Sequence, residues 1–376
     1  MVKPETLARW ESKIRPAIVS LGSPHQVTKL YSAGRKDFLA QLAEERPPIV
    51  RGSIVLQRTL WGLDFRSPII NAAGMWKNGR GYDVSFYQGA GGFLGGTTVW
   101  NDRIGNVKDG IENPFAPFPR SGMAGNSIGL RNSGDPEVAE WYENKIRVPD
   151  FPLGHSVMGS PDIKDRVEKI DRLVDGMRLY EEAGVDWLEN NWSCPNTEED
   201  RPDFDALERD VIEVNRYFLR NRSRKYGRVV PVVAKLSNDI PLSDVPRYVD
   251  MFIDYGYDGL NIGNTSTNYE SLRHSVHPKE RRLFDYFIST FGGGFSGSAL
   301  KNTSALLCKA AVDRVEERKP DREFHIFRTG GIEGAEDLII SDEIGVSMNQ
   351  WFTGYFEQFA QHGHKVYEQL YKKLTK

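Results

Sequence analysis

The sequence predicts an α/β protein: a closed (β/α)8 TIM barrel with a helical N-terminal extension and a β-hairpin closing the barrel bottom. After residue 65, eight short apolar runs rich in β-formers alternate with stretches of helical periodicity. Small and polar residues follow the ends of several of these runs, and 376 residues suit one barrel. An open doubly wound sheet is the weaker alternative, because it usually carries fewer strands and a single glycine-rich turn.

The expected strands are short and evenly distributed along the chain. Their centres are placed at 69–71, 93–96, 155–158, 187–191, 229–236, 259–264, 325–329 and 346–350. Amphipathic stretches at 167–182, 207–220 and 305–317 carry apolar residues at helical spacing and are expected to cover the barrel. Residues 51–376 are therefore predicted to form one catalytic domain, with residues 1–50 as a helical extension.

The extension contains two apolar stripes at helical spacing. They are formed by Leu7, Trp10, Ile14, Ile18 and Leu21 within 5–21, and by Val27, Leu30, Tyr31, Phe38 and Leu42 within 27–42. Two interpretations are open: helices packed on the barrel wall, or an element at a membrane surface or a quinone entry. Packing on the wall is favoured. After the extension, runs at 54–58 and 60–65 flank a Trp-Gly pair and predict the hairpin.

Composition excludes several classes of protein. A formal charge of −3 gives no sign of a nucleic-acid partner. Two widely spaced cysteines exclude a disulfide scaffold and a zinc ribbon, fit a reducing compartment, and leave little room for an iron–sulfur cluster. No apolar run reaches the ~18 residues of a spanning helix, and no secretory signal opens the chain. We expect a cytoplasmic protein without a metal site.

The most informative motif is the hexapeptide at 191–196, which reads NWSCPN. It follows a predicted strand and places Cys194 between Asn191 and Asn196, with a proline stiffening the exit. Strand tips of this kind carry the chemistry of parallel α/β proteins. A small buried thiol that only packs is the alternative for Cys194.

Small residues and cations mark other strand ends. Ala73 and Gly74 end the first strand and would let a flat ring approach the backbone, with Lys77 three residues on. Thr97 ends the second strand, and Lys235 lies at the end of the fifth. A lone lysine is often a surface group, but two at such strand ends fit an anionic ligand.

Two glycine clusters late in the chain predict a phosphate site. Gly297 closes the first cluster before a helix, and Gly330 and Gly331 follow the seventh strand before another. Free N–H groups at helix N-termini bind phosphate, and late barrel loops are its usual place. Each cluster alone could be an ordinary tight turn.

Four carboxamides occur at or after the ends of predicted strands. Asn126, Asn191, Asn196 and Asn264 can each donate and accept, so together they match a planar ring with alternating N–H and C=O groups. Any one of them could instead form a turn. Thr265 lies beside the last.

These motifs together resemble the dihydroorotate dehydrogenase family over roughly residues 55–360. The resemblance implies an FMN-containing barrel that oxidises dihydroorotate to orotate in pyrimidine synthesis. It implies Cys194 as catalytic base and Lys235 as the flavin lysine. It implies substrate binding by Lys77, Asn126, Asn191, Asn196, Asn264 and Thr265. Cofactor contacts would come from Ala73, Gly74, Lys77, Thr97, Asn191, Lys235, Gly297, Gly330, Gly331 and Thr353.

The resemblance combines two branches of the family. Cys194 and the NSIGL run at 126–130 resemble the soluble branch, whereas Lys77, the Asn264–Thr265 pair and the extension resemble the quinone-using branch, whose base is serine. Phe352 stands where tyrosine is usual. The electron acceptor is therefore left open among quinone, fumarate and a nicotinamide. Peripheral membrane contact through 5–42, at the inner face of a membrane, and a homodimer are also left open.

A mechanism follows as a hypothesis. Cys194, as thiolate, removes the C5 proton of dihydroorotate while C6 passes hydride to the flavin; an ordinary thiol pKa of ~8.5 is close enough to neutral for this role. Lys235 would stabilise the reduced flavin, and 197–204 would be either a lid or an ordinary loop. Rival functions are a dihydropyrimidine dehydrogenase-like flavin enzyme and a catalytically silent barrel that binds a nucleotide or a partner protein.

Overall fold

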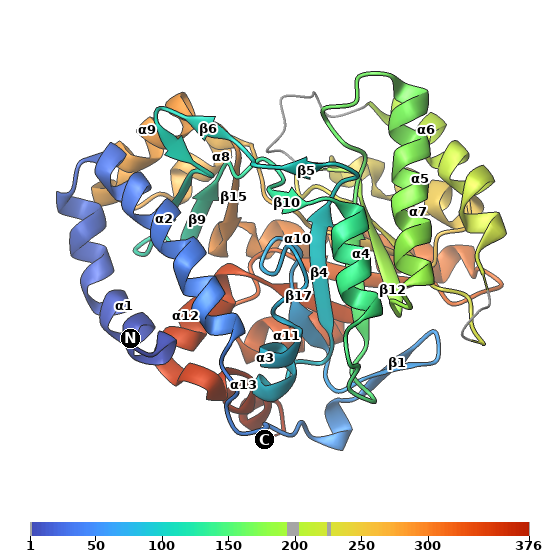
Figure 1. Cartoon of the computed structure of the whole chain (residues 1–376), viewed down its shortest axis with the longest axis horizontal. Helices are drawn as coiled ribbons and strands as arrows, with labels where there is room; N and C mark the ends of the chain where they lie inside the picture. The colour runs from blue at the N-terminus through green and yellow to red at the C-terminus, as the bar shows by residue number, and fades with distance from the viewer. Residues whose placement is uncertain (1, 194–202, 224–226, 376) are drawn as a thin grey trace.

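The computed structural model describes residues 2–193, 203–223 and 227–375. Eight parallel strands form its central sheet in the order β3-β17-β16-β14-β13-β12-β11-β4 (Figure 1). Their bounds are β3 Ile69–Asn71, β4 Phe93–Thr98, β11 Leu153–Val157, β12 Trp187–Asn191, β13 Val232–Leu236, β14 Gly259–Ile262, β16 His325–Thr329 and β17 Met348–Trp351. The predicted (β/α)8 barrel is confirmed. Five of the eight predicted strands differ from these bounds by up to three residues at an end.

A side chain bridges the seam between the first and last strands of this order. The Asn71 carboxamide on β3 donates to the Leu94 carbonyl on β4 at 2.6 Å and accepts from the Leu94 N–H at 3.3 Å. Beyond the strand ends, the Gly74 N–H donates to the Gly96 carbonyl at 2.6 Å. These bonds take the place of a regular backbone ladder, so the barrel is nearly closed.

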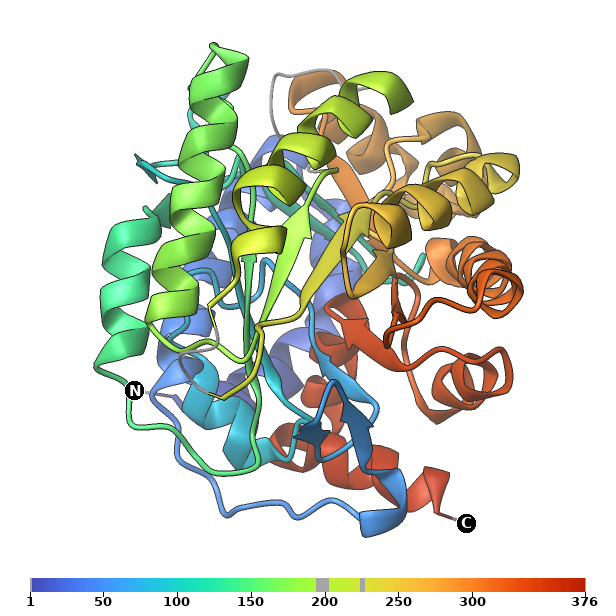
Figure 2. The same cartoon turned by 90° about the vertical axis from the view of Figure 1, so that its right-hand side faces the viewer.

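Helices surround the strands on the outside (Figure 2). They are α3 Tyr82–Gln88, α4 Asp135–Glu143, α5 Arg166–Glu182, α6 Phe204–Tyr217, α7 Val245–Asp254, α10 Lys301–Arg318, α11 Ala335–Glu343, α12 Thr353–His362 and α13 Val366–Leu374. Aspartates cap two of them: Asp165 accepts from the Glu168 N–H, and Asp203 accepts from the Ala206 N–H. The three predicted helical stretches correspond to α5, α6 and α10.

The predicted hairpin closes the N-terminal end of the barrel. Its strands β1 Arg58–Leu60 and β2 Leu63–Phe65 pair antiparallel. Trp61 in the turn stacks edge-on against His325 and donates through Nε1 to the Asp258 carbonyl at 3.1 Å. The first arm was predicted from residue 54, but 54–56 form a 3-10 turn. Leu60, Leu63 and Phe65 extend the apolar layer that fills the lower barrel with Ile70, Leu94, Trp187, Val233, Phe327 and Met348.

A small antiparallel sheet covers one side of the opposite end. Strands β8 Phe115–Phe118, β9 Met123–Asn126 and β15 Gly294–Gly297 pair in the order β15-β9-β8. Two of them lie in the β4–α4 connection, and the third lies between β14 and α10. The connection at 266–291 contains helices α8 Tyr269–Ser275 and α9 Arg281–Thr290. The pairing brings Asn126 opposite Gly294, so two distant loops meet beside the barrel mouth.

The extension forms helices α1 Pro4–Leu21 and α2 Pro24–Ala43, which lie beside α12 and β8 (Figure 1). Both helices pack against the rest of the protein, as favoured, but most of the apolar stripe of α1 does not face it. Exposed fractions are 72% for Trp10, 55% for Ile14 and 85% for Leu21, and Leu30 on α2 is also exposed. The buried face of α1 is formed instead by Pro4, Ala8, Arg15 and Val19.

The buried face of α1 includes one charged residue, Arg15, which joins the helix to the barrel. Arg15 is paired with Glu11 on its own helix and with Glu357 on α12. Glu11 in turn accepts from the Tyr31 hydroxyl on α2 at 2.7 Å. Four residues of the apolar stripe, Leu7, Trp10, Ile14 and Leu21, lie outside this buried face and are exposed. Of the helices in the described ranges, none is both long and apolar enough to cross a bilayer.

Candidate active site

A cavity of about 950 Å³, its open mouth included, lies at the C-terminal ends of the barrel strands. The predicted site residues that the structure describes all line it. These are Ala73, Gly74, Lys77, Thr97, Asn126, Asn191, Lys235, Asn264, Thr265, Gly297, Gly330, Gly331 and Thr353. Cys194 and Asn196, and most of the proposed lid at 197–204, lie outside the described residues. Residues that come from seven different strand ends or loops thus meet at one hollow.

The carboxamides at this cavity hold one another. Asn191, at the end of β12, donates to the Thr97 hydroxyl at 3.1 Å. Its oxygen accepts from the Ser193 N–H at 3.1 Å and from Asn264 Nδ2 at 3.3 Å. Asn126 comes from the covering sheet and donates to the Gly294 carbonyl at 3.1 Å. The strand ends therefore fix the orientation of the polar groups that face a ligand.

One hydroxyl at the cavity has no such partner. Thr265 Oγ1 is buried and finds no hydrogen-bond partner within the described part of the chain. The neighbouring Thr265 N–H is satisfied by the Asn264 side-chain oxygen at 3.0 Å. Buried polar atoms are nearly always paired, so an orphan at a cavity wall points to a ligand group.

Two helix N-termini meet at another part of the cavity. Gly297 and Leu300 precede α10, and Thr353 opens α12; all three line the hollow. The loop carrying Gly331 lies so close to α10 that a Cβ on Gly331 would lie 2.3 Å from the Cα of Lys301. Only glycine permits this approach. Helix N-termini carry partial positive charge and free N–H groups, which suit a phosphate.

The sequence analysis missed a polar layer directly beneath the cavity. Lys235 Nζ lies 3.2 Å from Oε1 of Glu189, and the two side chains are 3% and 0% exposed. Oε2 of Glu189 accepts from Asn261 at 2.8 Å and from Gln350 at 2.7 Å. One signal could have found it: Glu189 is two residues before Asn191 on the same strand, so both side chains point to the same face.

Of the two cysteines, only Cys308 lies within the described residues. Cys308 lies on α10 with its sulfur 3.7 Å from the carbonyls of Ile262 and Phe327, fully buried between helix and sheet. Burial raises the pKa of the Cys308 thiol to about 12. This thiol stays protonated at neutral pH and does not line the cavity. Cys308 is therefore no candidate for a thiolate base.

Comparisons with known proteins agree with this geometry. The family profile described as Dihydroorotate dehydrogenase matches residues 55–375. The dihydroorotate dehydrogenase (quinone) of Shewanella piezotolerans is 25% identical over 305 residues, 81% of this chain and 83% of the relative. That of Thermosynechococcus vestitus is 27% identical over 325 residues, 85% of this chain and 80% of the relative.

Solved structures show the same fold. The crystal structure of DHODH from Eimeria tenella in complex with ferulenol superimposes with a TM-score of 0.72 at 22% identity, covering 91% of this chain and 90% of that one. The ligand-free DHODH structure from the same organism superimposes with a TM-score of 0.73 at 20% identity, covering 91% of this chain and 93% of that one. The profile match extends over most of the sequence. The chain belongs to the dihydroorotate dehydrogenase family, whose members are oxidoreductases.

Proposed function

We propose that the chain oxidises dihydroorotate to orotate with FMN as cofactor and Cys194 as general base. One observation carries this proposal: lysines, carboxamides, an orphan hydroxyl and two helix N-termini line a single cavity at the strand ends. These groups fit FMN and a small anionic ring together. The helix N-termini suit the phosphate, the small residues Ala73 and Gly74 leave room for a flat ring, and the carboxamides suit the pyrimidine substrate.

Different residues of the chain would have different roles in this reaction. Bound FMN would supply the hydride acceptor. Cys194, as thiolate, would take the C5 proton of dihydroorotate, and the ordinary thiol pKa of ~8.5 makes enough thiolate available near neutral pH. Lys77 would balance the substrate carboxylate, while Asn126, Asn191, Asn196 and Asn264 orient the ring.

The base assignment is tested by replacing each cysteine in turn. Cys194→Ala should slow flavin bleaching by dihydroorotate ~10²–10⁴-fold in anaerobic stopped-flow absorbance, because general base catalysis is lost. Cys308→Ala is the matched control, since this buried thiol is away from the cavity, and it should bleach at the wild-type rate. Equal rates for Cys194→Ala and wild type would exclude Cys194 as the base.

A dihydropyrimidine dehydrogenase-like activity is the competing function. Lys77 speaks against it, because uracil offers no carboxylate to a cation. Steady-state turnover with dihydroorotate should therefore exceed turnover with uracil. Faster reaction with uracil and a nicotinamide donor would reverse the assignment.

For the electron acceptor we propose a quinone, reached at a membrane surface. Curated relatives carry quinone in their names, and the exposed stripe of α1 gives an apolar face of the type that lies in a bilayer interface. Reducing the protein with dihydroorotate and then offering a quinone, fumarate or NAD should give fastest reoxidation with the quinone.

The membrane contact is tested on the stripe itself. Trp10→Glu with Ile14→Glu should abolish cosedimentation with lipid vesicles, since both side chains are more than half exposed. The folded protein should lose less than ~0.5 kcal/mol of stability because these positions bury little. Wild-type protein that does not bind vesicles would exclude the contact.

A further inference from the structure

A fully buried carboxylate occupies the barrel interior below the cavity. Glu189 on β12 is 0% exposed and does not line the cavity. Barrel interiors are usually filled by branched apolar side chains, as the lower layer of this barrel is. A charge at this depth is costly to bury and calls for an explanation beyond packing.

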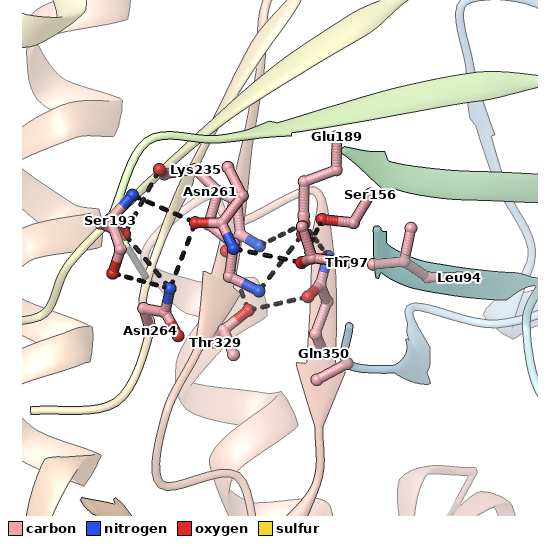
Figure 3. Close-up of polar contacts among 12 residues, drawn as sticks. Leu94, Thr97, Ser156, Glu189, Ser193, Lys235, Asn261, Asn264, Thr329 and Gln350 are labelled. Carbon is pink, nitrogen blue, oxygen red and sulfur yellow. Dashed lines mark hydrogen bonds and ion pairs between the residues drawn. The ribbon is translucent and has the colours of Figure 1, made fainter. Parts of the chain in front are cut away.

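The carboxylate collects donors from three other strands (Figure 3). Lys235 on β13 contacts Oε1 at 3.2 Å, and Asn261 on β14 and Gln350 on β17 donate to Oε2 at 2.8 and 2.7 Å. The Thr329 hydroxyl lies 2.9 Å from Asn261 Oδ1 and 3.1 Å from Gln350 Oε1. Both carboxamides are thereby turned with their NH2 groups toward Glu189.

Lys235 lies between this carboxylate and the cavity. It lines the cavity, and Glu189 is the one carboxylate with which it forms an ion pair in the described ranges. Both side chains are almost completely shielded from water, so their charges interact with each other and with a ligand far more strongly than surface charges would. A neutral side chain of the same shape could accept from the amides, but it could not offset the ammonium.

We propose that Glu189 is a positioning residue that fixes the Lys235 ammonium at the cavity wall and offsets its charge, and thereby sets the reduction potential of the bound flavin. The inference rests on the proposed FMN site. Charge near the flavin ring is one of the means by which proteins tune that cofactor. A lysine without its counter-charge would favour the reduced flavin, so the native pair holds the potential lower.

The test is the two-electron reduction potential of bound FMN, measured against reference dyes without dihydroorotate. Glu189→Gln should raise the potential by ~30 mV or more, which corresponds to a tenfold change in the equilibrium constant of a two-electron couple. Asn261→Ala is the matched control: it also removes a contact to Glu189 but no charge, and its shift should be less than a third as large.

The outcomes separate this inference from the proposed function. An unchanged potential in Glu189→Gln, with wild type still reduced by dihydroorotate, would overturn the inference and leave the function standing. A raised potential in a protein that dihydroorotate does not reduce would overturn the function and support the inference.

A second comparison covers the case in which Glu189→Gln alone does not fold. Lys235→Gln is compared with the double variant Glu189→Gln/Lys235→Gln, which carries neither charge of the pair. The double variant should have a potential ~30 mV or more above that of Lys235→Gln, because it lacks the uncompensated negative charge of Glu189. Equal potentials in these two variants would overturn the inference, because the charge of Glu189 would then have no effect at the flavin.

Discussion

Two polar networks lie on opposite faces of the same strand. On β4, Thr97 points into the barrel, 2.9 Å from the Ser156 hydroxyl, and belongs to the layer around Asn191. Thr98, the next residue, points outward to the helices and lies 2.7 Å from His155 Nε2. The alternation of side chains along a strand thus separates an interior network from a wall network.

The wall network consists of hydroxyl and imidazole groups around one carboxyl, that of Asp135. His155 Nδ1 lies 2.8 Å from the Tyr142 hydroxyl, and the Tyr180 hydroxyl donates to Asp135 at 3.0 Å. Burial lowers the pKa of His155 to about 3 and raises the pKa of Asp135 to about 6. The interior network instead contains a paired ammonium and carboxylate and ends at a cavity. The two networks therefore differ in that the buried carboxylate of the interior is paired with an ammonium beside the cavity, whereas the wall network holds a carboxyl whose pKa is raised by burial.

The largest effect on stability should follow from breaking the ion pair of Lys235 and Glu189. Lys235→Met leaves Glu189 as an unpaired buried carboxylate, which should cost ~3–5 kcal/mol in the free energy of unfolding measured with guanidinium. Glu189→Gln/Lys235→Met removes both charges and should recover most of the loss. A cost below ~1 kcal/mol in the single variant would mean that water reaches the pair, and the contrast between the networks would weaken.

The wall network should respond to pH through two opposed titrations. The pKa of Asp135 is raised in the folded protein. Its contribution to the free energy of unfolding is therefore complete below pH 3.8 or so and is lost as pH rises through about 6. His155 has a lowered folded pKa, so its contribution is present above about 6.5 and is lost as pH falls toward about 3. Between pH 6 and 4, the pH dependence of the free energy of unfolding that Asp135 causes nearly cancels the opposite dependence that His155 causes in the wild type.

Asp135→Asn removes the contribution of Asp135 to the pH dependence of stability and leaves that of His155. Its free energy of unfolding should fall by ~3 kcal/mol more than that of wild type between pH 6.5 and 4, because the acid sensitivity of His155 is no longer offset. Denaturant titrations at a series of pH values measure this difference. Asp205→Asn is the control, since that carboxylate is 72% exposed. Parallel profiles for Asp135→Asn and wild type would contradict a buried, protonated Asp135.

Strand ends were predictable because they combine local signals. Small residues at Ala73 and Gly74, the lysine at Lys235 and the glycines at Gly330 and Gly331 each follow an apolar run, and barrel geometry brings all such ends to one face. The (β/α)8 barrel itself follows from the alternating periodicities. No sheet pairing had to be known to expect these residues together.

What the sequence did not reveal depends on contacts between distant segments. The β15-β9-β8 sheet joins loops about 170 residues apart, and the sequence of neither loop predicts with which segment it pairs. The stripe of α1 has the correct period, but periodicity does not say which face of a helix is covered. The covered face of α1 carries Ala8, Arg15 and Val19 instead. Glu189 was missed because a carboxylate within an apolar strand has no visible partner until β13, β14 and β17 surround it.

The smallest predicted effect compares one hydroxyl from each network region. Tyr142 in the wall network is satisfied by His155 at 2.8 Å, whereas the Thr265 hydroxyl at the cavity is buried without a partner in the described ranges. Tyr142→Phe should cost ~1 kcal/mol of stability and leave orotate affinity unchanged.

Thr265→Val should leave stability within ~0.5 kcal/mol but weaken orotate binding by ~1 kcal/mol, about fivefold, in a fluorescence titration. A loss of stability without loss of affinity in Thr265→Val would make its hydroxyl a structural group like that of Tyr142. The opposite pattern would mean that this hydroxyl is left unpaired in the protein because its partner is the ligand.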